Sequence, residues 1–322
     1  MIPKRTVVLG GVGFIGSHLC HRLIEEGHEV FCIDVRDITH APQLRTLQRN
    51  AAFHYIHHNI IHPFGIRCDE LYNLAAPTVV HYSKQLPVET LQLCTIGSIH
   101  ALDTARSEHA RVVYASTGSI SNMTTKQMWS DQPRFSRHIL TEGKMAAESL
   151  HRAYRQEFGV DTRIARIYNT YGIGSNLMDQ RVVTKMVVAA LQNRDIRIEG
   201  NGEQMRTFCY VEDVVEGLTT LMRALATDHT RIVNLGSDEQ ITIRDLAQMI
   251  VEMTGSRSRI LHVEPRTEEI QNRTPDLNTT RRELGWNPAT RLTEGLKRTI
   301  DYTERELSER AGAFYSWIEV NH

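Results

Sequence analysis

The feature that most constrains the fold is a glycine-rich loop near the start of the chain, Gly-Gly-Val-Gly-Phe-Ile-Gly at residues 10–16. An apolar stretch at residues 6–9 predicts a strand before the loop, and the apolar face of residues 17–26 predicts a helix after it. Residues 30–33 are apolar again and complete a strand, helix and strand unit. Because its glycines lack Cβ atoms and it leads into a helix N-terminus, the loop predicts a site for a dinucleotide pyrophosphate.

An acidic residue at the end of the second strand indicates which dinucleotide is bound. Asp34 follows Gly16 by eighteen residues. A carboxylate at this position accepts hydrogen bonds from the adenosine ribose hydroxyls and repels a 2′-phosphate, so NAD is favoured over NADP. Arg36 is the residue that could reverse this preference, because a guanidinium can pair with a 2′-phosphate. The alternative for Arg36 is an arginine solvated at the surface.

Strand and helix patterns continue to alternate beyond the loop. Apolar stretches at residues 70–74, 111–115 and 162–168 are separated by helical patterns, which predicts an α/β protein with a Rossmann-type, doubly wound parallel sheet. The regular alternation of strand and helix patterns ends after Tyr171 and Gly172. We therefore expect an NAD-binding domain at residues 1–170 and a smaller mixed α/β substrate domain at residues 171–322, and leave open whether the chain crosses between them.

Two helical stretches, residues 88–109 and 141–158, have wide apolar faces. Such a face packs on the sheet or forms a helix-pair dimer interface, and the sequence leaves both alternatives open.

Composition excludes several classes of function. The 322 residues carry 37 Lys and Arg against 38 Asp and Glu, a balance that offers no general attraction to nucleic acid or anionic lipid. No stretch reaches the roughly 20 apolar residues of a transmembrane helix, and the strand at residues 6–9 leaves no room for a leader before it. The five cysteines form no CxxC pair, so we expect reduced thiols, no metal site and a cytoplasmic protein.

Several segments in a fixed order carry a resemblance to a known family. They are residues 10–19, 71–77, 115–117, 165–172, 178–183, 200–213, 273–276 and 284–288. Together they resemble the extended short-chain dehydrogenase/reductase family, and within it the UDP-glucuronate decarboxylase branch, over essentially the whole chain. The resemblance implies NAD as cofactor, a UDP-sugar or related nucleotide-sugar as ligand, and a homodimer.

The resemblance also implies two sets of binding residues. The positions that would contact NAD are Gly10, Gly13, Phe14, Ile15, Gly16, Asp34, Asn59, Ile60, Leu74, Ala75, Thr95, Lys144 and Tyr168. Those that would line the nucleotide-sugar site are Asn169, Arg181, Val182, Arg206, Tyr210 and Arg273. The arginines offer bidentate donors to a diphosphate, although for each one taken singly an ordinary surface residue is the favoured interpretation.

The resemblance breaks at the acid–base residues. In the family a tyrosine four residues before a lysine takes the proton of the sugar hydroxyl, and here Lys144 is present but the tyrosine is Leu140. Loss of a positioned general base typically removes about 10² to 10⁴ in rate. The family's glutamate after the serine–threonine strand end is Ser119, and its helix asparagine is Cys94. The segment between residues 117 and 144 is also shorter than in the branch.

Three residues are candidates to share the chemistry with Lys144. His138 lies two residues before Leu140 and titrates near neutrality, although a solvated loop histidine is the alternative. Glu142 matches an acid of the branch, or it is a first-turn acid of the helix. Thr117 keeps the position of the family's catalytic hydroxyl.

Two further groups of residues are given ordinary structural interpretations. Cys94 lies in an apolar helical pattern, which favours a buried thiol over a nucleophile. His54, His57 and His58 lack the spacing of metal ligands and are interpreted as a strand and loop surface.

The sequence thus predicts an NAD-dependent, nucleotide-sugar-modifying enzyme that resembles UDP-glucuronate decarboxylase but has an atypical active site. Two alternatives remain open: an epimerase or dehydratase that acts on a UDP-sugar with a different base, and a non-catalytic protein that binds NAD or a nucleotide-sugar.

Overall fold

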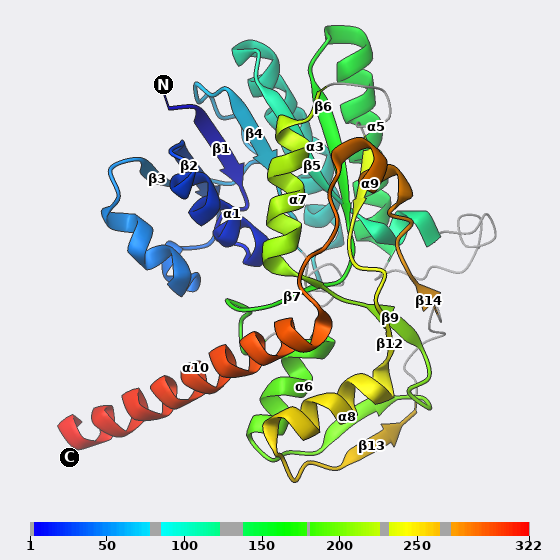
Figure 1. The fold of residues 1–322 in the computed structure, drawn as a ribbon. Coiled ribbons are helices and arrows are strands. Elements are labelled where there is room, and N and C mark those ends of the chain that lie inside the picture. Colours follow the sequence, from blue (N-terminus) through cyan, green and yellow to red (C-terminus); the bar gives the residue numbers. More distant parts are fainter. Residues whose placement is uncertain are drawn as a thin grey trace. The chain divides into compact units, whose positions relative to one another are not determined.

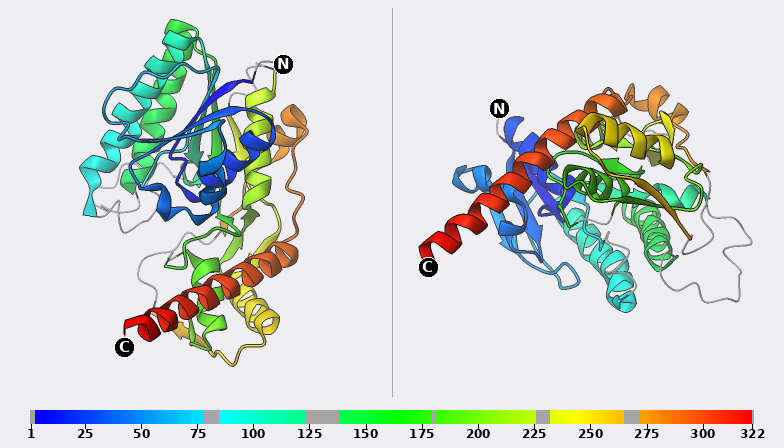
Figure 2. Two further views of the ribbon diagram at one scale, coloured as in Figure 1. Left: turned by 90° about the vertical axis from the view of Figure 1, so that its left-hand side faces the viewer. Right: turned by 90° about the horizontal axis from the view of Figure 1, so that it is seen from below.

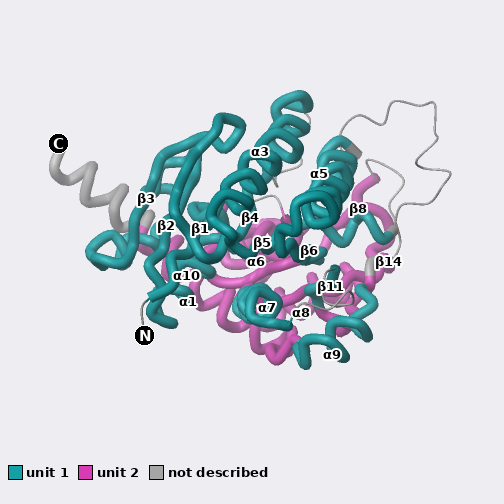
Figure 3. The backbone as a smooth tube through the Cα atoms, turned by 90° about the horizontal axis from the view of Figure 1, so that it is seen from above, with its two compact units in different colours: residues 1–168, 212–236, 275–287 teal, residues 169–211, 237–274, 288–322 magenta. Residues whose placement is uncertain are grey.

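The computed structural model describes residues 3–77, 85–122, 138–178, 181–225, 232–264 and 272–321 (Figure 1). The chain divides into two units (Figure 3). The first contains residues 1–168, 212–236 and 275–287, and the second contains residues 169–211, 237–274 and 288–322. The first transition therefore falls between residues 168 and 169, and two later segments return to the first unit.

The first unit is built on a seven-stranded sheet in the order β11-β6-β5-β4-β1-β2-β3. All neighbouring strands are parallel, and the order reverses beside β1, as in a doubly wound Rossmann sheet. This confirms the predicted fold class. The strands are β1 (Arg5–Leu9), β2 (Glu29–Asp34), β3 (Phe53–His57), β4 (Glu70–Asn73), β5 (Arg111–Thr117), β6 (Thr162–Ile167) and β11 (Ile232–Leu235).

Helices cover both faces of this sheet. Helices α3 (Pro87–Glu108) and α5 (His138–Phe158) pack side by side on one face, and α1 (Phe14–Glu25) and α7 (Val211–Arg223) lie on the other (Figure 2). Because both faces are covered, β1 can be apolar along most of its length, and Val7, Val8 and Leu9 are fully buried. The short elements are η1 (Ile38–His40), η2 (Pro42–Arg49), η3 (Gly118–Asn122) and α9 (Asn278–Leu284).

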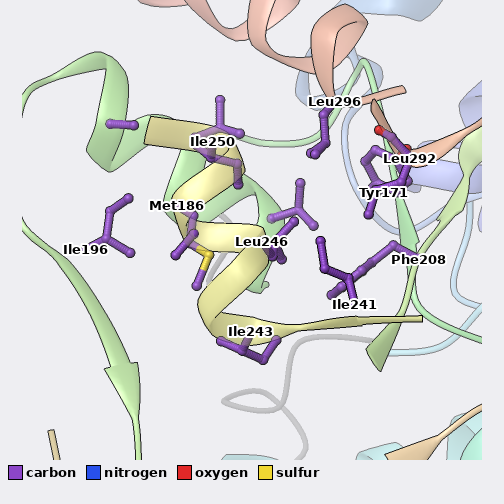
Figure 4. Close-up of a cluster of buried hydrophobic side chains, with 14 of the residues drawn as sticks. Tyr171, Met186, Ile196, Phe208, Ile241, Ile243, Leu246, Ile250, Leu292 and Leu296 are labelled. Carbon is purple, nitrogen blue, oxygen red and sulfur yellow. The ribbon is translucent and has the colours of Figure 1, made fainter. Parts of the chain in front are cut away.

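The second unit has its own apolar core (Figure 4). Leu246 and Ile250 of α8 and Leu296 of α10 are fully buried there. The Thr242 side chain accepts a hydrogen bond from the Asp245 N–H at the start of α8, and Gly255, at φ +60°, follows its end. The helices of this unit are α6 (Val182–Leu191), α8 (Ile243–Thr254) and α10 (Leu292–Asn321).

Short strand pairs complete the second unit. Strand β9 pairs with β12 antiparallel and with β14 parallel, while β8 pairs with β13 and β7 pairs with β10, both in parallel. The strands are β7 (Thr170–Tyr171), β8 (Ile196–Glu199), β9 (Met205–Thr207), β10 (Cys209–Tyr210), β12 (Gln240–Thr242), β13 (Ile260–Val263) and β14 (Asn272–Arg273). Among the described residues, no helix combines the length and the apolar character that a membrane span requires.

Candidate active site

The glycine loop lies at the carboxyl end of β1, where it turns into α1. The Gly10 N–H donates to the Ile33 carbonyl at 2.8 Å, and the Gly13 N–H donates to the Gly10 carbonyl at 3.0 Å. A Cβ on Gly16 would lie 2.3 Å from the Gly10 carbonyl oxygen, and a Cβ on Gly13 would lie 2.8 Å from the same atom. The loop therefore closes on itself, and only glycine fits at these two positions.

Asp34 lies directly beside this loop, at the end of β2. Its Oδ2 accepts a hydrogen bond from the Val12 N–H at 3.0 Å, and its Oδ1 accepts one from the Arg36 N–H at 2.9 Å. The carboxylate is buried, yet each oxygen keeps a second lone pair. The acid is therefore fixed against the loop and can still accept from a ribose hydroxyl.

Other residues of the predicted cofactor set lie around the carboxyl ends of the strands. A Cβ on Gly10 would lie 2.9 Å from the Ala75 Cα, so the segment after β4, Leu74 and Ala75, packs against the loop. The Tyr168 side chain, after β6, lies against Gly118 and Gly236: a Cβ added to Gly118 would meet its ring at 2.6 Å, and one added to Gly236 would meet its Cβ at 2.9 Å. The structure thus brings these positions to one edge of the sheet, as a doubly wound fold requires of its ligand site.

The remaining predicted cofactor positions occupy varied environments. Phe14 and Ile15 open α1 and are partly exposed. Asn59 follows β3 and accepts from the Ile61 N–H, while Ile60 is buried against Gly97 of α3. The Thr95 hydroxyl donates within α3 to the Leu91 carbonyl at 2.7 Å.

Lys144 lies at the centre of the candidate acid–base site. Its side chain is buried on α5, and its Nζ donates to the Ala115 carbonyl of β5 at 2.6 Å. The same Nζ lies 4.7 Å from the centre of the Tyr114 ring, a cation–π contact. Burial lowers the pKa of Lys144. The lysine is therefore held rigidly by β5.

Leu140 lies one helical turn before Lys144 on α5, so the two share a face of the helix. Its side chain is partly exposed and carries no group that can transfer a proton. Thr117 ends β5 and accepts a hydrogen bond from the Ser119 N–H at 3.2 Å. The structure therefore places the predicted lysine and hydroxyl near the end of β5 and a hydrocarbon side chain at residue 140, where the resemblance implies a base.

The other candidate bases receive little support. Glu142 is exposed in the second turn of α5, whose described part begins at His138. It is therefore not an acid of the first helical turn. His138 is the first described residue of α5, and its side chain lies outside the described residues.

Cys94 is buried, as expected for a structural thiol, and burial raises its pKa. A Cβ on Gly143 would lie 3.0 Å from the Cys94 Cβ, which places this thiol where α3 and α5 approach closely.

The sequence reasoning missed Glu148, which lies one turn beyond Lys144 on α5. It is buried and accepts two hydrogen bonds from Arg166 of β6, at 2.9 and 2.8 Å, and one from the Ser116 hydroxyl at 2.7 Å. This bidentate ion pair raises the pKa of Arg166. The spacing of Lys144 and Glu148 was the one available signal, because residues four apart share a helix face.

His151 was missed as well. It is fully buried and stacks on the Tyr114 ring at 4.5 Å between ring centres, while its Nδ1 donates to the Ala147 carbonyl at 2.8 Å. Burial lowers the pKa of His151 to about 4. Lys144 and His151 are seven residues apart, or about 10 Å along a helix, which leaves space for the Tyr114 ring between them.

The histidines of β3 contact β2 and the segment that follows it. His54 contacts Glu29 at 3.1 Å, and His57 donates from Nε2 to the Val35 carbonyl at 2.8 Å. Within the described ranges, no three His, Cys, Asp or Glu side chains come together in a way that could hold a metal ion.

All six predicted nucleotide-sugar residues belong to the second unit. Asn169 donates from Nδ2 to the Thr207 carbonyl at 3.0 Å, and Arg206 is largely buried and donates to the Met205 carbonyl at 2.7 Å. Arg206 and Arg273 are register partners on β9 and β14. The backbones of these two arginines therefore lie one strand spacing apart.

Three more residues of this set are placed by the structure. Arg181 is exposed immediately before Val182, the first residue of α6. Tyr210 is buried on β10, and the Arg298 guanidinium lies 5.6 Å from the centre of its ring. Val182 packs against the apolar core of the unit. The side chain of Arg273 lies outside the described residues.

Comparison with known proteins assigns the family. Residues 6–236 match the model of the NAD dependent epimerase/dehydratase family. The chain belongs to this family. The family match confirms NAD as the cofactor and confirms that the chain is of an enzyme class that modifies nucleotide-sugars.

Relatives of known sequence include UDP-glucuronic acid decarboxylase 1 of Danio rerio, 35% identical over 318 residues, which cover 97% of this chain and 75% of the relative. UDP-glucuronic acid decarboxylase 1 of Arabidopsis thaliana is 35% identical over 316 residues, covering 96% of this chain and 72% of the relative. The similarity therefore extends over both units.

Two solved structures show the same fold. UDP-glucose 4-epimerase of Thermotoga maritima, solved with UDP-glucose, superposes with a TM-score of 0.81 at 24% identity, over 94% of this chain and 99% of that chain. A mutant of UDP-glucuronic acid 4-epimerase of Bacillus cereus, solved with NAD and UDP-4-deoxy-4-fluoro-glucuronic acid, gives a TM-score of 0.82 at 21% identity, over 94% of this chain and 99% of that chain.

Proposed function

We propose that the protein is an NAD-dependent enzyme that acts on a UDP-linked uronic acid, and that it removes CO₂ from UDP-glucuronate slowly. The observation that carries the proposal is that Lys144 of α5 donates to the Ala115 carbonyl of β5 and that Thr117 ends the same strand, in a unit that also contains the glycine loop and Asp34. The similarity to UDP-glucuronic acid decarboxylases over almost the whole chain supports the choice of substrate.

Decarboxylation of a uronic acid is easy only after the neighbouring hydroxyl has become a ketone. In that oxidation the hydroxyl proton leaves to a base and the hydride leaves the carbon; the carbon–carbon bond then breaks with loss of CO₂, and a proton replaces the carboxylate. When bound, NAD supplies the hydride acceptor and later returns the hydride. The residues of this chain must therefore orient the sugar and carry its hydroxyl proton.

Removal of the proton from the sugar hydroxyl is the difficult step for this protein. Thr117 can hydrogen-bond the sugar hydroxyl, but an unactivated hydroxyl is a poor base. Lys144 is held against the Ala115 carbonyl and can stabilise developing negative charge. His138 remains the sequence candidate for a base. With Leu140 in place of a tyrosine, we expect a rate about 10² to 10⁴ below that of an enzyme with a positioned base.

The test follows product mass. Purified protein, NAD and UDP-glucuronate are incubated for hours, with UDP-glucose and UDP-galacturonate in parallel, and the products are separated by chromatography and weighed. We expect a product lighter than UDP-glucuronate by CO₂, formed slowly, and none after Lys144→Ala. Arg152→Ala, on the exposed part of α5, is the matched control and should keep the wild-type rate.

Two outcomes would overturn the decarboxylase proposal. An isomer of unchanged mass would assign an epimerase with a different base. Binding of UDP-glucuronate and NAD without any new product would assign a non-catalytic nucleotide-sugar-binding protein.

We also propose that α3 forms the interface of a homodimer. Its exposed apolar residues include Val88, with 67% of its surface accessible, together with Leu91 and Ile96. An apolar helix face of this kind is a common interface feature. Val88→Glu combined with Leu91→Glu should convert a dimer to a monomer in sedimentation velocity, and a wild-type monomer would contradict the proposal.

A cytoplasmic location is the proposal that best fits the cysteines. All five are free and buried, which suits a reducing compartment. The chemistry of CO₂ loss would make the enzyme a lyase.

A further inference from the structure

Arg36 is an arginine placed beside the cofactor acid that the NAD assignment does not use. It follows Asp34 by two residues, and half of its side-chain surface is exposed. Among the described residues its guanidinium pairs with Asp34, with Nε 3.7 Å from Oδ1, which is longer than a hydrogen bond. The donors of the guanidinium are therefore available to a ligand.

The backbone that carries Arg36 is held from three sides. The Asp34 Oδ1 accepts from the Arg36 N–H at 2.9 Å. The Tyr55 hydroxyl donates to the Arg36 carbonyl at 2.9 Å, and His57 donates from Nε2 to the Val35 carbonyl at 2.8 Å. Tyr55 and His57 of β3 thus hold the backbone at residues 35 and 36 in place, and with it the position of Arg36.

The guanidinium reaches from the acid to the glycine loop. A Cβ on Gly13 would lie 3.6 Å from the Arg36 Nη2, and Gly13 is the residue that precedes α1. The cation therefore lies between Asp34, which marks the adenosine ribose, and the helix N-terminus, which marks the pyrophosphate. We therefore expect a phosphate on the ribose 2′-oxygen to be within reach of this cation.

Arg36 also weakens the repulsion between Asp34 and a 2′-phosphate. A free carboxylate excludes NADP because it repels the 2′-phosphate. In this chain both Asp34 oxygens accept backbone N–H groups, and the guanidinium offsets the negative charge. A planar guanidinium can in addition donate two parallel hydrogen bonds to a phosphate.

We propose that Arg36 is a specificity-determining residue that lets this protein bind NADP as well as NAD. For NADP, the Arg36 guanidinium turns from Asp34 to the 2′-phosphate. For NAD, the second lone pairs of Asp34 accept the ribose hydroxyls. The inference concerns the cofactor alone and does not depend on the sugar chemistry proposed above.

The test is equilibrium binding, with no turnover required. Bound nucleotide is removed on charcoal, and the dissociation constants of NAD and NADP are measured by titration calorimetry for the wild type, Arg36→Ala, Arg36→Lys and Asp34→Asn. Arg152→Ala removes the same charge from exposed α5 and is the matched control.

We expect the wild-type constants for NAD and NADP to differ by less than 30-fold. Arg36→Ala should weaken NADP at least tenfold and NAD less than threefold, Arg36→Lys should weaken NADP by a smaller factor, and Asp34→Asn should shift the ratio toward NADP. Arg152→Ala should leave both constants unchanged. A wild-type ratio above 30-fold, or an Arg36→Ala variant that changes the ratio by less than threefold, would overturn the proposal.

Discussion

At the scale of single residues, the site depends on how a buried ammonium is compensated. Lys144 has only 5% of its surface exposed, and removing its charge from water is costly. The Ala115 carbonyl, the Tyr114 ring and the negative charge of Glu148 offset this cost. Glu148 is in turn neutralised by Arg166, so one buried network joins α5 to β5 and β6.

Glu148→Gln tests that network. The change keeps the shape of the side chain but leaves the Arg166 guanidinium without its ionic partner, so we expect a loss of about 2 to 4 kcal/mol in unfolding free energy. Chemical denaturation measures it. The matched control is Glu294→Gln, because Glu294 pairs with Arg298 on the exposed surface of α10 at 2.5 Å. That change should cost less than about 1 kcal/mol, and equal losses in the two variants would contradict the account.

His151 predicts how stability depends on pH. Its pKa is about 4 in the folded protein, below the usual value near 6.5 in an unfolded chain. The folded state therefore favours the neutral ring, and the stability it contributes is complete above pH 6.5 and is lost as the pH falls toward 4. Between pH 7 and 5 this loss amounts to about 2 kcal/mol.

The variant His151→Gln removes the titrating group and should flatten that part of the pH profile of the unfolding free energy. His62→Gln, at an exposed histidine, should keep the wild-type slope. If His151→Gln and His62→Gln had the same slope between pH 7 and 5, the buried neutral ring would be refuted as the cause.

At the scale of elements, the glycine loop and the start of α1 pack so closely that an added methyl group would clash. Gly16→Ala would place a methyl group 2.3 Å from the Gly10 carbonyl oxygen and 2.8 Å from the Gly11 Cα. Since both are backbone atoms, the loop itself must move. We expect NAD affinity to fall at least about tenfold, or about 1.4 kcal/mol, with a lower melting temperature.

The matched control for Gly16→Ala is Gly65→Ala, whose added methyl group meets no atom within 4 Å. Calorimetric titration with NAD and thermal unfolding measure both variants. A Gly16→Ala protein that binds NAD like the wild type would show that the loop is not the binding element.

Most of the first unit was predictable because its strands are short apolar stretches between helical patterns. The strands β1, β2, β4, β5 and β6 were predicted to within about two residues, the usual uncertainty of element ends. Helix α1 begins at Phe14, before the predicted start at Ser17, because the loop turns fully within residues 10–13. Strand β11 was missed, since its four residues become a strand only by pairing with β6.

The candidate site was predictable where local spacing carries the chemistry. The glycines, Asp34 and Lys144 could be found in this way, because each lies in a recognisable local pattern. The pair of Glu148 and Arg166 and the stack of Tyr114 and His151 could not, because each joins a helix to a strand that is distant in the sequence. Arg36 was noticed, but its reach toward Gly13 depends on support from β3.

At the scale of the whole molecule, the proposed function places binding residues in both units, and the chain lacks the tyrosine that the resemblance implies as a base. The first unit holds the glycine loop, Asp34 and Lys144, and the second holds Arg206, Tyr210 and Arg181. Family membership confirms the cofactor. We therefore expect ligand binding to be ordinary and hydride transfer to be slow.

One measurement tests this separation most directly: the reduction of bound nicotinamide in a single turnover. Protein saturated with NAD is mixed with UDP-glucuronate, and the near-ultraviolet absorbance of NADH is followed for the wild type and for Leu140→Tyr. We predict dissociation constants for UDP-glucuronate within about threefold of each other and a nicotinamide reduction at least about tenfold faster in Leu140→Tyr. Equal reduction rates in the two proteins would contradict the account, because Leu140 would then not mark a missing base.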